Sequence, residues 1–182
     1  MTKNNFYILS GGPGGGKTSL LEYLAAKGFN YIPETAREII RERLSKGLSP
    51  RPDPGTFARE MFFKDHENYI SNLDSTAPLF FDRSFIDSAG LLYDADINAY
   101  NQIRDTHLIN RYNDKVFITP PWKEIYQTDS ERDQTYEQAI AVYEKVCRWY
   151  TTNEYEIILL PKDTIENRAN FILKQLSNLS NG

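Results

Sequence analysis

The chain is poor in cysteine and histidine and has no long apolar run. Cys147 is its only cysteine, so an intramolecular disulfide is excluded, and we expect a small buried thiol in a reducing compartment. The two histidines, His66 and His107, lack partners at metal-ligand spacing, so we expect both to be surface or helix-face residues and expect no zinc site. No apolar stretch approaches the roughly 20 residues needed to cross a bilayer, so no membrane span is expected.

A surplus of basic residues is also missing. The chain has 21 Lys and Arg against 25 Asp and Glu, a formal net charge of −4, which argues against a broad nucleic-acid surface. Residues 1–5 contain no basic region followed by a long apolar stretch, so we expect no export signal and a cytoplasmic location. The length of 182 residues suits one domain over residues 1–182, with a frayed polar tail at 177–182.

Strand-like segments alternate with helical patterns along the chain. Short apolar runs occur at 6–9, 30–32, 79–81, 116–118 and 157–160, and helical patterns at 18–27, 36–46, 56–72, 134–153 and 164–176. Because parallel strands need crossover connections, and these are right-handed, helices should cover both faces of the sheet. The sequence therefore predicts an α/β fold, a three-layer α/β/α sandwich around a parallel sheet.

One glycine-rich run has the clearest functional meaning. Directly after the apolar residues 6–9 the chain has the spacing G-x-x-x-x-G-K-[ST], and a helix-forming segment follows at once. Glycines let backbone N–H groups converge on an anion, and the helix N-terminus adds its partial positive charge there. The pattern predicts a nucleoside triphosphate site, the phosphate loop, formed by Gly11, Gly12, Pro13, Gly14, Gly15, Gly16, Lys17, Thr18 and Ser19.

Two side chains of this loop have chemical roles. Lys17 should reach the β- and γ-phosphates, and the Thr18 hydroxyl is placed to ligate the Mg²⁺ that neutralises them. ATP and Mg²⁺ are therefore the expected cofactors. The alternative is a plain turn between strand and helix, which requires glycine but neither the lysine nor the threonine.

The third strand should end at a second part of the site, because open parallel sheets bind ligands at the carboxyl ends of their strands. Asp82 follows the apolar residues 79–81 and is our candidate for the carboxylate associated with Mg²⁺. Its alternative role is to cap a helix that starts near Phe85. Arg83 is placed to stabilise charge on the transferred group, or else to form a structural ion pair with Asp82 or Asp87.

Glu34 follows the second strand and is the candidate for meeting an acceptor hydroxyl. A carboxylate there can accept the proton of an attacking hydroxyl or orient it. The alternative is a glutamate favoured only by the dipole at a helix start. Arg37 lies one helical turn further on, so the two can act together on substrate or merely pair with each other.

Residues 120–133, which we call the lid segment, follow the fourth strand and mix aromatic with charged side chains. Arg132 and Lys123 are the cations that can close over phosphates, and Trp122 and Tyr126 can cover a ring. The alternative is a solvated loop. The acceptor pocket should be built from the proline-rich connection at 47–55 and the helices near it.

Several classes of phosphate-loop protein are disfavoured. Asp82 is followed by Arg83 rather than by the glutamate that activates water in motor ATPases, and the region after the fourth strand has no Asn-Lys-x-Asp signature for guanine. A small-molecule kinase with a hydroxyl acceptor is the leading hypothesis. The alternatives are a nucleotide-dependent switch or partner-binding module with slow hydrolysis, and a triphosphate phosphohydrolase.

Four segments together resemble the NadR-type AAA domain family: 11–18, 32–37, 81–84 with Asp87, and 120–122 with Asp129 and Arg132. That family is similar to the ribosylnicotinamide kinase domain of the bacterial NAD regulator and to deoxynucleoside kinases. The resemblance implies a five-stranded sheet in the order 2-3-1-4-5, binding of Mg-ATP and phosphoryl transfer to a small hydroxyl acceptor. It also implies that Glu34 contacts the acceptor, that 82–84 form an acid-Arg-Ser segment, and that Arg132 is a lid arginine.

Overall fold

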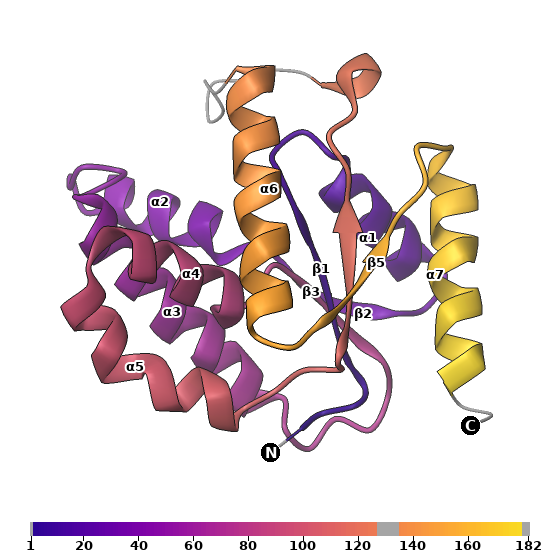
Figure 1. Ribbon diagram of the computed structural model, residues 1–182, viewed down its shortest axis with the longest axis horizontal. Helices are drawn as coiled ribbons and strands as arrows, with labels where there is room; N and C mark the ends of the chain where they lie inside the picture. Colours follow the sequence, from indigo (N-terminus) through magenta and orange to yellow (C-terminus); the bar gives the residue numbers. More distant parts are fainter. Residues whose placement is uncertain (1, 127–134, 180–182) are drawn as a thin grey trace.

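The computed structural model describes residues 2–126 and 135–179 and confirms the predicted α/β/α sandwich (Figure 1). Its strands are β1 (Phe6–Gly11), β2 (Asn30–Ile32), β3 (Leu79–Asp82), β4 (Lys115–Thr119) and β5 (Glu156–Leu159). Its helices are α1 (Lys17–Ala26), α2 (Thr35–Ser45), α3 (Pro54–Ser71), α4 (Phe85–Ala95), α5 (Ile97–Ile109), α6 (Tyr136–Thr152) and α7 (Ile165–Leu179), with a 3₁₀ turn η1 (Lys123–Ile125) after β4.

The sheet has the order β2-β3-β1-β4-β5 with every pair parallel, so the expected topology is confirmed. The central strand β1 is buried along its whole length, as expected for a parallel strand with both faces covered. Phe6 and Ile8 face one hydrophobic core, and Tyr7 and Leu9 face the other. This alternation of strand side chains places two separate cores on the two sides of the sheet.

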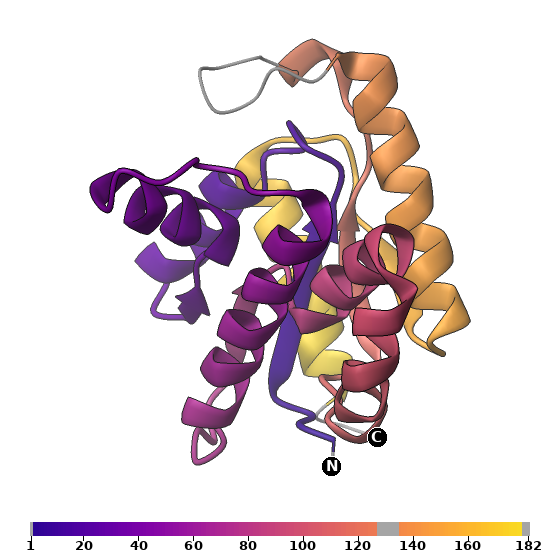
Figure 2. The same ribbon diagram turned by 90° about the vertical axis from the view of Figure 1, so that its left-hand side faces the viewer.

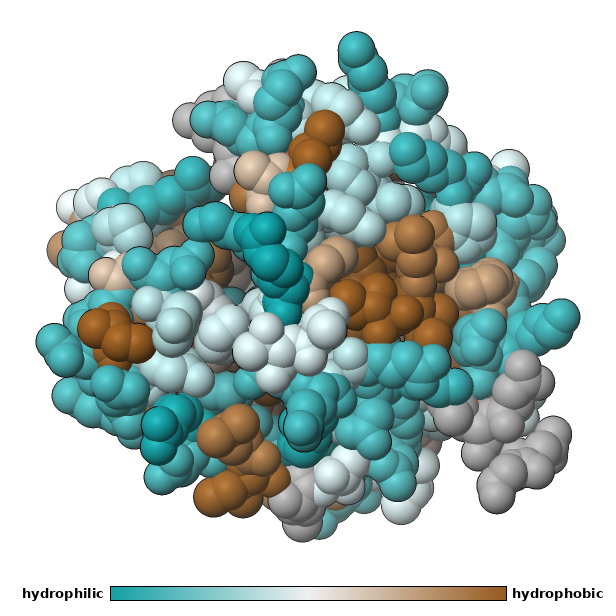
Figure 3. Space-filling view, in the orientation of Figure 1, coloured by the Kyte–Doolittle hydropathy of each residue, from teal (hydrophilic) through white to brown (hydrophobic). Residues whose placement is uncertain are grey.

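Helices of different origin fill the two outer layers. The core around Leu9 is completed by Leu20 and Leu24 of α1 and by Ile172 of α7. The core around Phe6 is completed by α3, α4 and α6, and Figure 2 shows α3 and α4 side by side on that face. The edge strand β5 leaves Leu159 half exposed, and Figure 3 shows apolar surface gathered over this region.

Three features of the fold differ from the predictions. The helix α5 was not predicted, because only Asp96 separates it from α4; this residue ends α4 and its side chain accepts from the backbone of Asn98 and Ala99. The last helix continues to Leu179, three residues into the segment predicted as a tail. His107 is buried, not on the surface, and bonds the Tyr100 hydroxyl at 3.0 Å.

No helix within residues 2–126 and 135–179 is both long enough and apolar enough to span a bilayer.

Candidate functional site

A cavity of about 770 Å³ opens at the carboxyl edge of the sheet. It exists there because all five strands are parallel, so their ends and the loops that follow them meet at one edge. Residues 13–19 form one part of its wall. Other parts come from the starts of α2 and α4 and from the flanks of α3 and α6; they include Glu34, Phe57, Asp65, Arg83 and Trp149.

The phosphate loop joins β1 to α1 in the predicted strand-loop-helix arrangement. Gly16 caps α1 with a backbone φ of 73°, in the left-handed region that residues other than glycine rarely adopt. A Cβ on Gly15 would collide with the hydroxyl of Thr119 at the end of β4. Because Pro13 to Ser19 line the cavity, the N-terminus of α1, the end of a helix that favours anions, lies at its wall.

Lys17 is the first residue of α1 and directly follows the glycines of the phosphate loop. Its side chain is buried, and Nζ donates to the carbonyl of Gly12 at 3.0 Å. Its charge acts on both predicted carboxylates, since it opposes protonation of Glu34 and of Asp82. Thr18 and Ser19 are exposed and line the cavity. The loop therefore offers a cation and two hydroxyls to one space.

Asp82 ends β3 and is only 4% exposed. Its Oδ1 has no hydrogen-bond partner among the described residues, and burial raises the pKa of the carboxyl although Lys17 opposes the shift. The alternative role as a helix cap is wrong, because Ser84 caps α4 and accepts from the backbone N–H of Ile86 at 3.1 Å. The Asp82 carboxylate therefore has no capping role, and the strand pairing places Asp82 beside Leu9 of β1, just before the phosphate loop.

Asp82 and the Thr18 hydroxyl form a donor set that fits Mg²⁺. The described residues contain no cluster of three or more His, Cys, Asp or Glu that could hold a metal. Magnesium is usually bound through one or two carboxylates together with substrate phosphates rather than by a complete protein cage. The unpartnered oxygen of Asp82 is of the ligand type that such a site requires from the protein.

Glu34 and Arg83 form a close ion pair at the cavity. Arg83 Nε donates to Glu34 Oε1 at 2.9 Å, and Arg37 Nε lies 3.6 Å from Glu34 Oε2. Burial by itself would raise the pKa of Glu34, but Arg83 and then Lys17 outweigh it, so the pKa lies below its ordinary value. Glu34 precedes α2 but makes no side-chain cap hydrogen bond within the described chain. It is an ionised group aimed at its cations.

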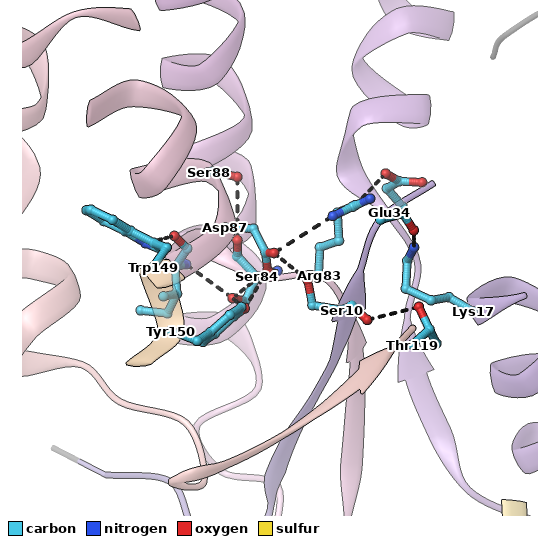
Figure 4. A network of polar contacts seen from close by, with 12 residues as sticks. Ser10, Lys17, Glu34, Arg83, Ser84, Asp87, Ser88, Thr119, Trp149 and Tyr150 are labelled. Atoms are coloured by element: carbon cyan, nitrogen blue, oxygen red, sulfur yellow. Dashed lines mark hydrogen bonds and ion pairs between the residues drawn. The ribbon is translucent and has the colours of Figure 1, made fainter. Parts of the chain in front are cut away.

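Asp87 in the first turn of α4 anchors this arrangement from behind (Figure 4). Its carboxylate accepts from the Ser10 hydroxyl at the end of β1, from the Tyr150 hydroxyl of α6 at 2.6 Å, and from the Ser84 backbone at 2.9 Å. Arg83 Nη1 lies 3.8 Å from Asp87 Oδ1, so the guanidinium stands between Asp87 and Glu34. Of the two alternative partners predicted for Arg83, Asp87 is therefore present.

Arg83 itself has a backbone φ of 68°, in the left-handed region. A bulky residue seldom adopts this conformation unless the surrounding structure holds it there. Contacts with Glu34 and Asp87 hold the side chain in place. Burial by itself would lower the pKa of the guanidinium, but the negative charges of these carboxylates outweigh it and raise the pKa. The side chain is thereby fixed as a cation in the cavity wall.

Asp65 on α3 is a cavity residue that sequence reasoning missed. It is 7% exposed, and its two carboxylate oxygens accept from the hydroxyls of Thr35 at 2.7 Å and Ser88 at 2.6 Å. Burial raises its pKa to about 7. A signal was present, because Asp65 continues the helical spacing of the buried face that Phe62 and Tyr69 occupy.

The lid segment is only partly described. Lys123 belongs to the exposed turn η1, and the Tyr126 ring lies so close to Gly14 that a Cβ there would collide with it. Arg132 and Asp129 lie outside the described residues, so the prediction for this arginine stays a prediction. Trp122 packs instead against an arginine of α7 that the sequence did not bring to attention, Arg168.

Comparison with known families gives one match. The model of a family described as AAA domain matches residues 6–168, which is most of the chain and includes every described residue of the candidate site. No curated protein sequence matches significantly.

Solved structures share the fold. A deoxyadenosine kinase from M. mycoides, with the products dCMP and dCDP bound, has a TM-score of 0.65 and 16% identity over 98% of this chain and 100% of that one. NadR protein in complex with NR has a TM-score of 0.71 and 16% identity over 95% of this chain. NadR protein with NAD and AMP-PNP gives 0.63 and 14% over 94%. The matched region covers 50% and 49% of those two NadR chains.

Proposed function

The chain belongs to the AAA domain family, and on that premise we propose that it is a kinase that transfers the γ-phosphoryl group of ATP to a hydroxyl of a small, nucleoside-like molecule. The observation that carries the proposal is the arrangement around one cavity of a phosphate loop and an ionised carboxylate, Glu34, held by Arg83. A nucleotide site alone requires the loop. A carboxylate held beside it is what an acceptor hydroxyl requires.

On the donor side, the loop from Gly11 to Ser19 binds the phosphates through its backbone N–H groups, and Lys17 adds a cation to the β- and γ-phosphates. For this, Nζ must exchange its bond to Gly12 for a phosphate oxygen. Thr18 and Asp82 are the residues that would hold Mg²⁺, and the ion would supply positive charge that neutralises the phosphates.

On the acceptor side, Glu34 orients the hydroxyl and takes its proton. The hydroxyl oxygen forms a bond to the γ-phosphorus while the bond from that phosphorus to the β–γ bridging oxygen breaks, which leaves ADP and a phosphorylated acceptor. Arg83 stabilises charge on the transferred group, and Arg132 is proposed to do so from the lid segment. Much of this catalysis is positioning and electrostatics.

The rest of the cavity suits a small ring with polar edges. Phe57 and Met61 of α3 and Trp149 of α6 give it apolar walls, and Asp65 adds a polar group. The solved structures of similar fold, which hold dCMP and dCDP in one case and NR in another, support a nucleoside-like acceptor. We place the activity in the cytoplasm, where ATP and Mg²⁺ are available.

The experiment that tests this proposal incubates the protein with Mg²⁺ and ATP or GTP, with and without a panel of nucleosides, nicotinamide riboside and vitamin alcohols. Products are identified by mass. A phosphorylated acceptor that forms with wild type and not with Lys17→Ala supports the kinase. Free phosphate without a phosphorylated acceptor favours the phosphohydrolase, and tight binding with slow turnover favours the switch.

A further inference from the structure

Arg168 of α7 lies directly behind the phosphate loop. Its Nη2 donates to the carbonyl of Gly15 at 2.9 Å, although the two residues are 153 positions apart in the sequence. Its Nη1 is 3.0 Å from the point where a Cβ on Gly16 would lie. The residue is 2% exposed, and it is the largest fully buried side chain of the described residues. A guanidinium is thus buried within contact distance of the loop backbone that lines the cavity.

This buried cation has no counter-ion in the described chain. No carboxylate lies within ion-pair distance of Arg168 among residues 2–126 and 135–179, and its Nε has no hydrogen-bond partner there. Its other contact is the ring of Trp122, 6.0 Å from the guanidinium carbon. Burial lowers the pKa of the side chain, with no acidic neighbour to oppose the shift. Such a charge is costly unless an anion compensates it.

The contact with Gly15 has a direct consequence for the loop. The Gly15 carbonyl and the Gly16 N–H belong to the same peptide group, so a cation at the oxygen draws electrons away from the nitrogen. The Gly16 N–H becomes a stronger donor toward an anion in the loop. The charge of Arg168 therefore favours phosphate binding by polarising the Gly15–Gly16 peptide group.

We propose that Arg168 is a positioning residue for the polyphosphate, acting through the Gly15–Gly16 peptide, and that the polyphosphate of a nucleoside di- or triphosphate is the counter-anion this buried cation lacks. The inference rests on the proposed function only in requiring phosphates in the loop. It does not require an acceptor or turnover. The competing role is a structural pin that fastens α7 to the loop.

The two roles predict opposite signs for one substitution. Arg168→Met keeps much of the length and apolar packing of the side chain and removes its charge. If the charge serves the phosphates, the ligand-free variant melts at the same or a higher temperature than wild type, because an uncompensated buried charge is gone. If Arg168 is a pin, the ligand-free variant melts at a lower temperature.

Binding is measured by calorimetry for ATP, AMP and adenosine on wild type, Arg168→Met, Arg168→Lys and the control Lys174→Met. Lys174 is an exposed cation on the same helix, so its removal tests the loss of charge alone. We expect Arg168→Met to lose about tenfold or more in ATP affinity, little for adenosine, and an intermediate amount for AMP. Arg168→Lys should recover part of the loss, and Lys174→Met should bind as wild type.

Equal losses for ATP and adenosine, or a lowered ligand-free melting temperature, would overturn the proposal, as would unchanged ATP affinity in Arg168→Met. If the Met variant does not fold, Arg168→Lys decides, since a retained charge with poorer geometry must still weaken ATP more than adenosine. Wild type that binds ATP but phosphorylates no acceptor leaves this inference intact and removes the kinase. Wild type that binds no polyphosphate removes both.

Discussion

Arg83 donates its Nε–H to Oε1 of Glu34 at 2.9 Å, although the two residues are 49 positions apart. Glu34 follows β2, and Arg83 follows β3. These two strands are paired in parallel, so their carboxyl ends lie side by side. The contact holds the glutamate ionised by lowering its pKa. The shift keeps the carboxylate ionised, which is the form that the proposed role of orienting a hydroxyl and taking its proton requires.

Glu34→Gln should lower kcat by about 10² to 10⁴, because an amide of the same shape cannot take the proton of the acceptor. The affinity for ATP should change little. The measurement is kcat with the acceptor identified by mass, together with the Kd of ATP. Glu38→Gln, in the first turn of the helix α2 that follows Glu34, is the control, since Glu38 pairs with Lys64 and not with the Arg83 guanidinium. A variant whose kcat stays within threefold of wild type would show that Glu34 has no proton-transfer role.

The parts of this protein that sequence reasoning reached are those encoded locally. The phosphate loop is one continuous run, and each strand is a short apolar segment, so their presence follows from patterns within ten residues, whereas the order of the strands in the sheet was implied by the family resemblance. The start of the helix α4 was placed near Phe85, with Asp82 as its cap in the alternative to the metal role. Ser84 proves to be the cap, which a short-range capping box with Asp87 could have indicated.

The parts that were missed depend on contacts between distant segments. Asp65 accepts hydrogen bonds from hydroxyls on α2 and α4, and Arg168 of the last helix donates to the phosphate loop. Neither belongs to a motif, and an aspartate or an arginine in an amphipathic helix is usually on the solvated face. Only the packing of α3 and α7 against the sheet brings these two side chains to the cavity and its wall.

Asp82→Asn should abolish the enhancement of ATP affinity by Mg²⁺ and leave the affinity without Mg²⁺ nearly unchanged. The buried carboxylate has an oxygen without a partner among the described residues, and the amide cannot supply the charge that the metal needs. Titrations of ATP with MgCl₂ or with EDTA measure the difference. Because burial raises the pKa of Asp82, the ligand-free variant should be no less stable than wild type.

The matched control for Asp82→Asn is Asp74→Asn, which changes an exposed aspartate just before β3. It should keep the full effect of Mg²⁺. If Asp82→Asn keeps that effect as well, the metal is held elsewhere and the assignment of Asp82 is wrong.

Tyr150→Phe should lower the free energy of unfolding by about 1–3 kcal/mol, because the Asp87 carboxylate loses the hydroxyl that donates at 2.6 Å in a buried site. Urea unfolding followed by circular dichroism gives the value. Tyr93→Phe is the control, because that ring is about half exposed, and its change should be within 0.5 kcal/mol of zero. A Tyr150 variant as stable as this control would mean that Asp87 is satisfied without α6.

Asp65 should make the stability of the protein depend on pH. Its pKa is about 7 in the folded chain against an ordinary value of 3.8, so the folded state binds more protons between these values. The free energy of unfolding contributed by this group therefore falls as the pH rises from about 4 to about 7, and the loss is complete above that. The shift corresponds to a loss of up to about 4 kcal/mol.

Asp65→Asn removes the titration and keeps a group that can bond both the Thr35 and Ser88 hydroxyls, by accepting from one and donating to the other. The variant should therefore gain stability over wild type progressively between about pH 4 and about pH 7. Urea unfolding at each pH measures this difference, and Asp105→Asn, at an exposed position, should show none. A difference that stays constant with pH would mean that Asp65 ionises alike in the folded and unfolded chain, and that its two hydroxyl donors offset the cost of burying the charge.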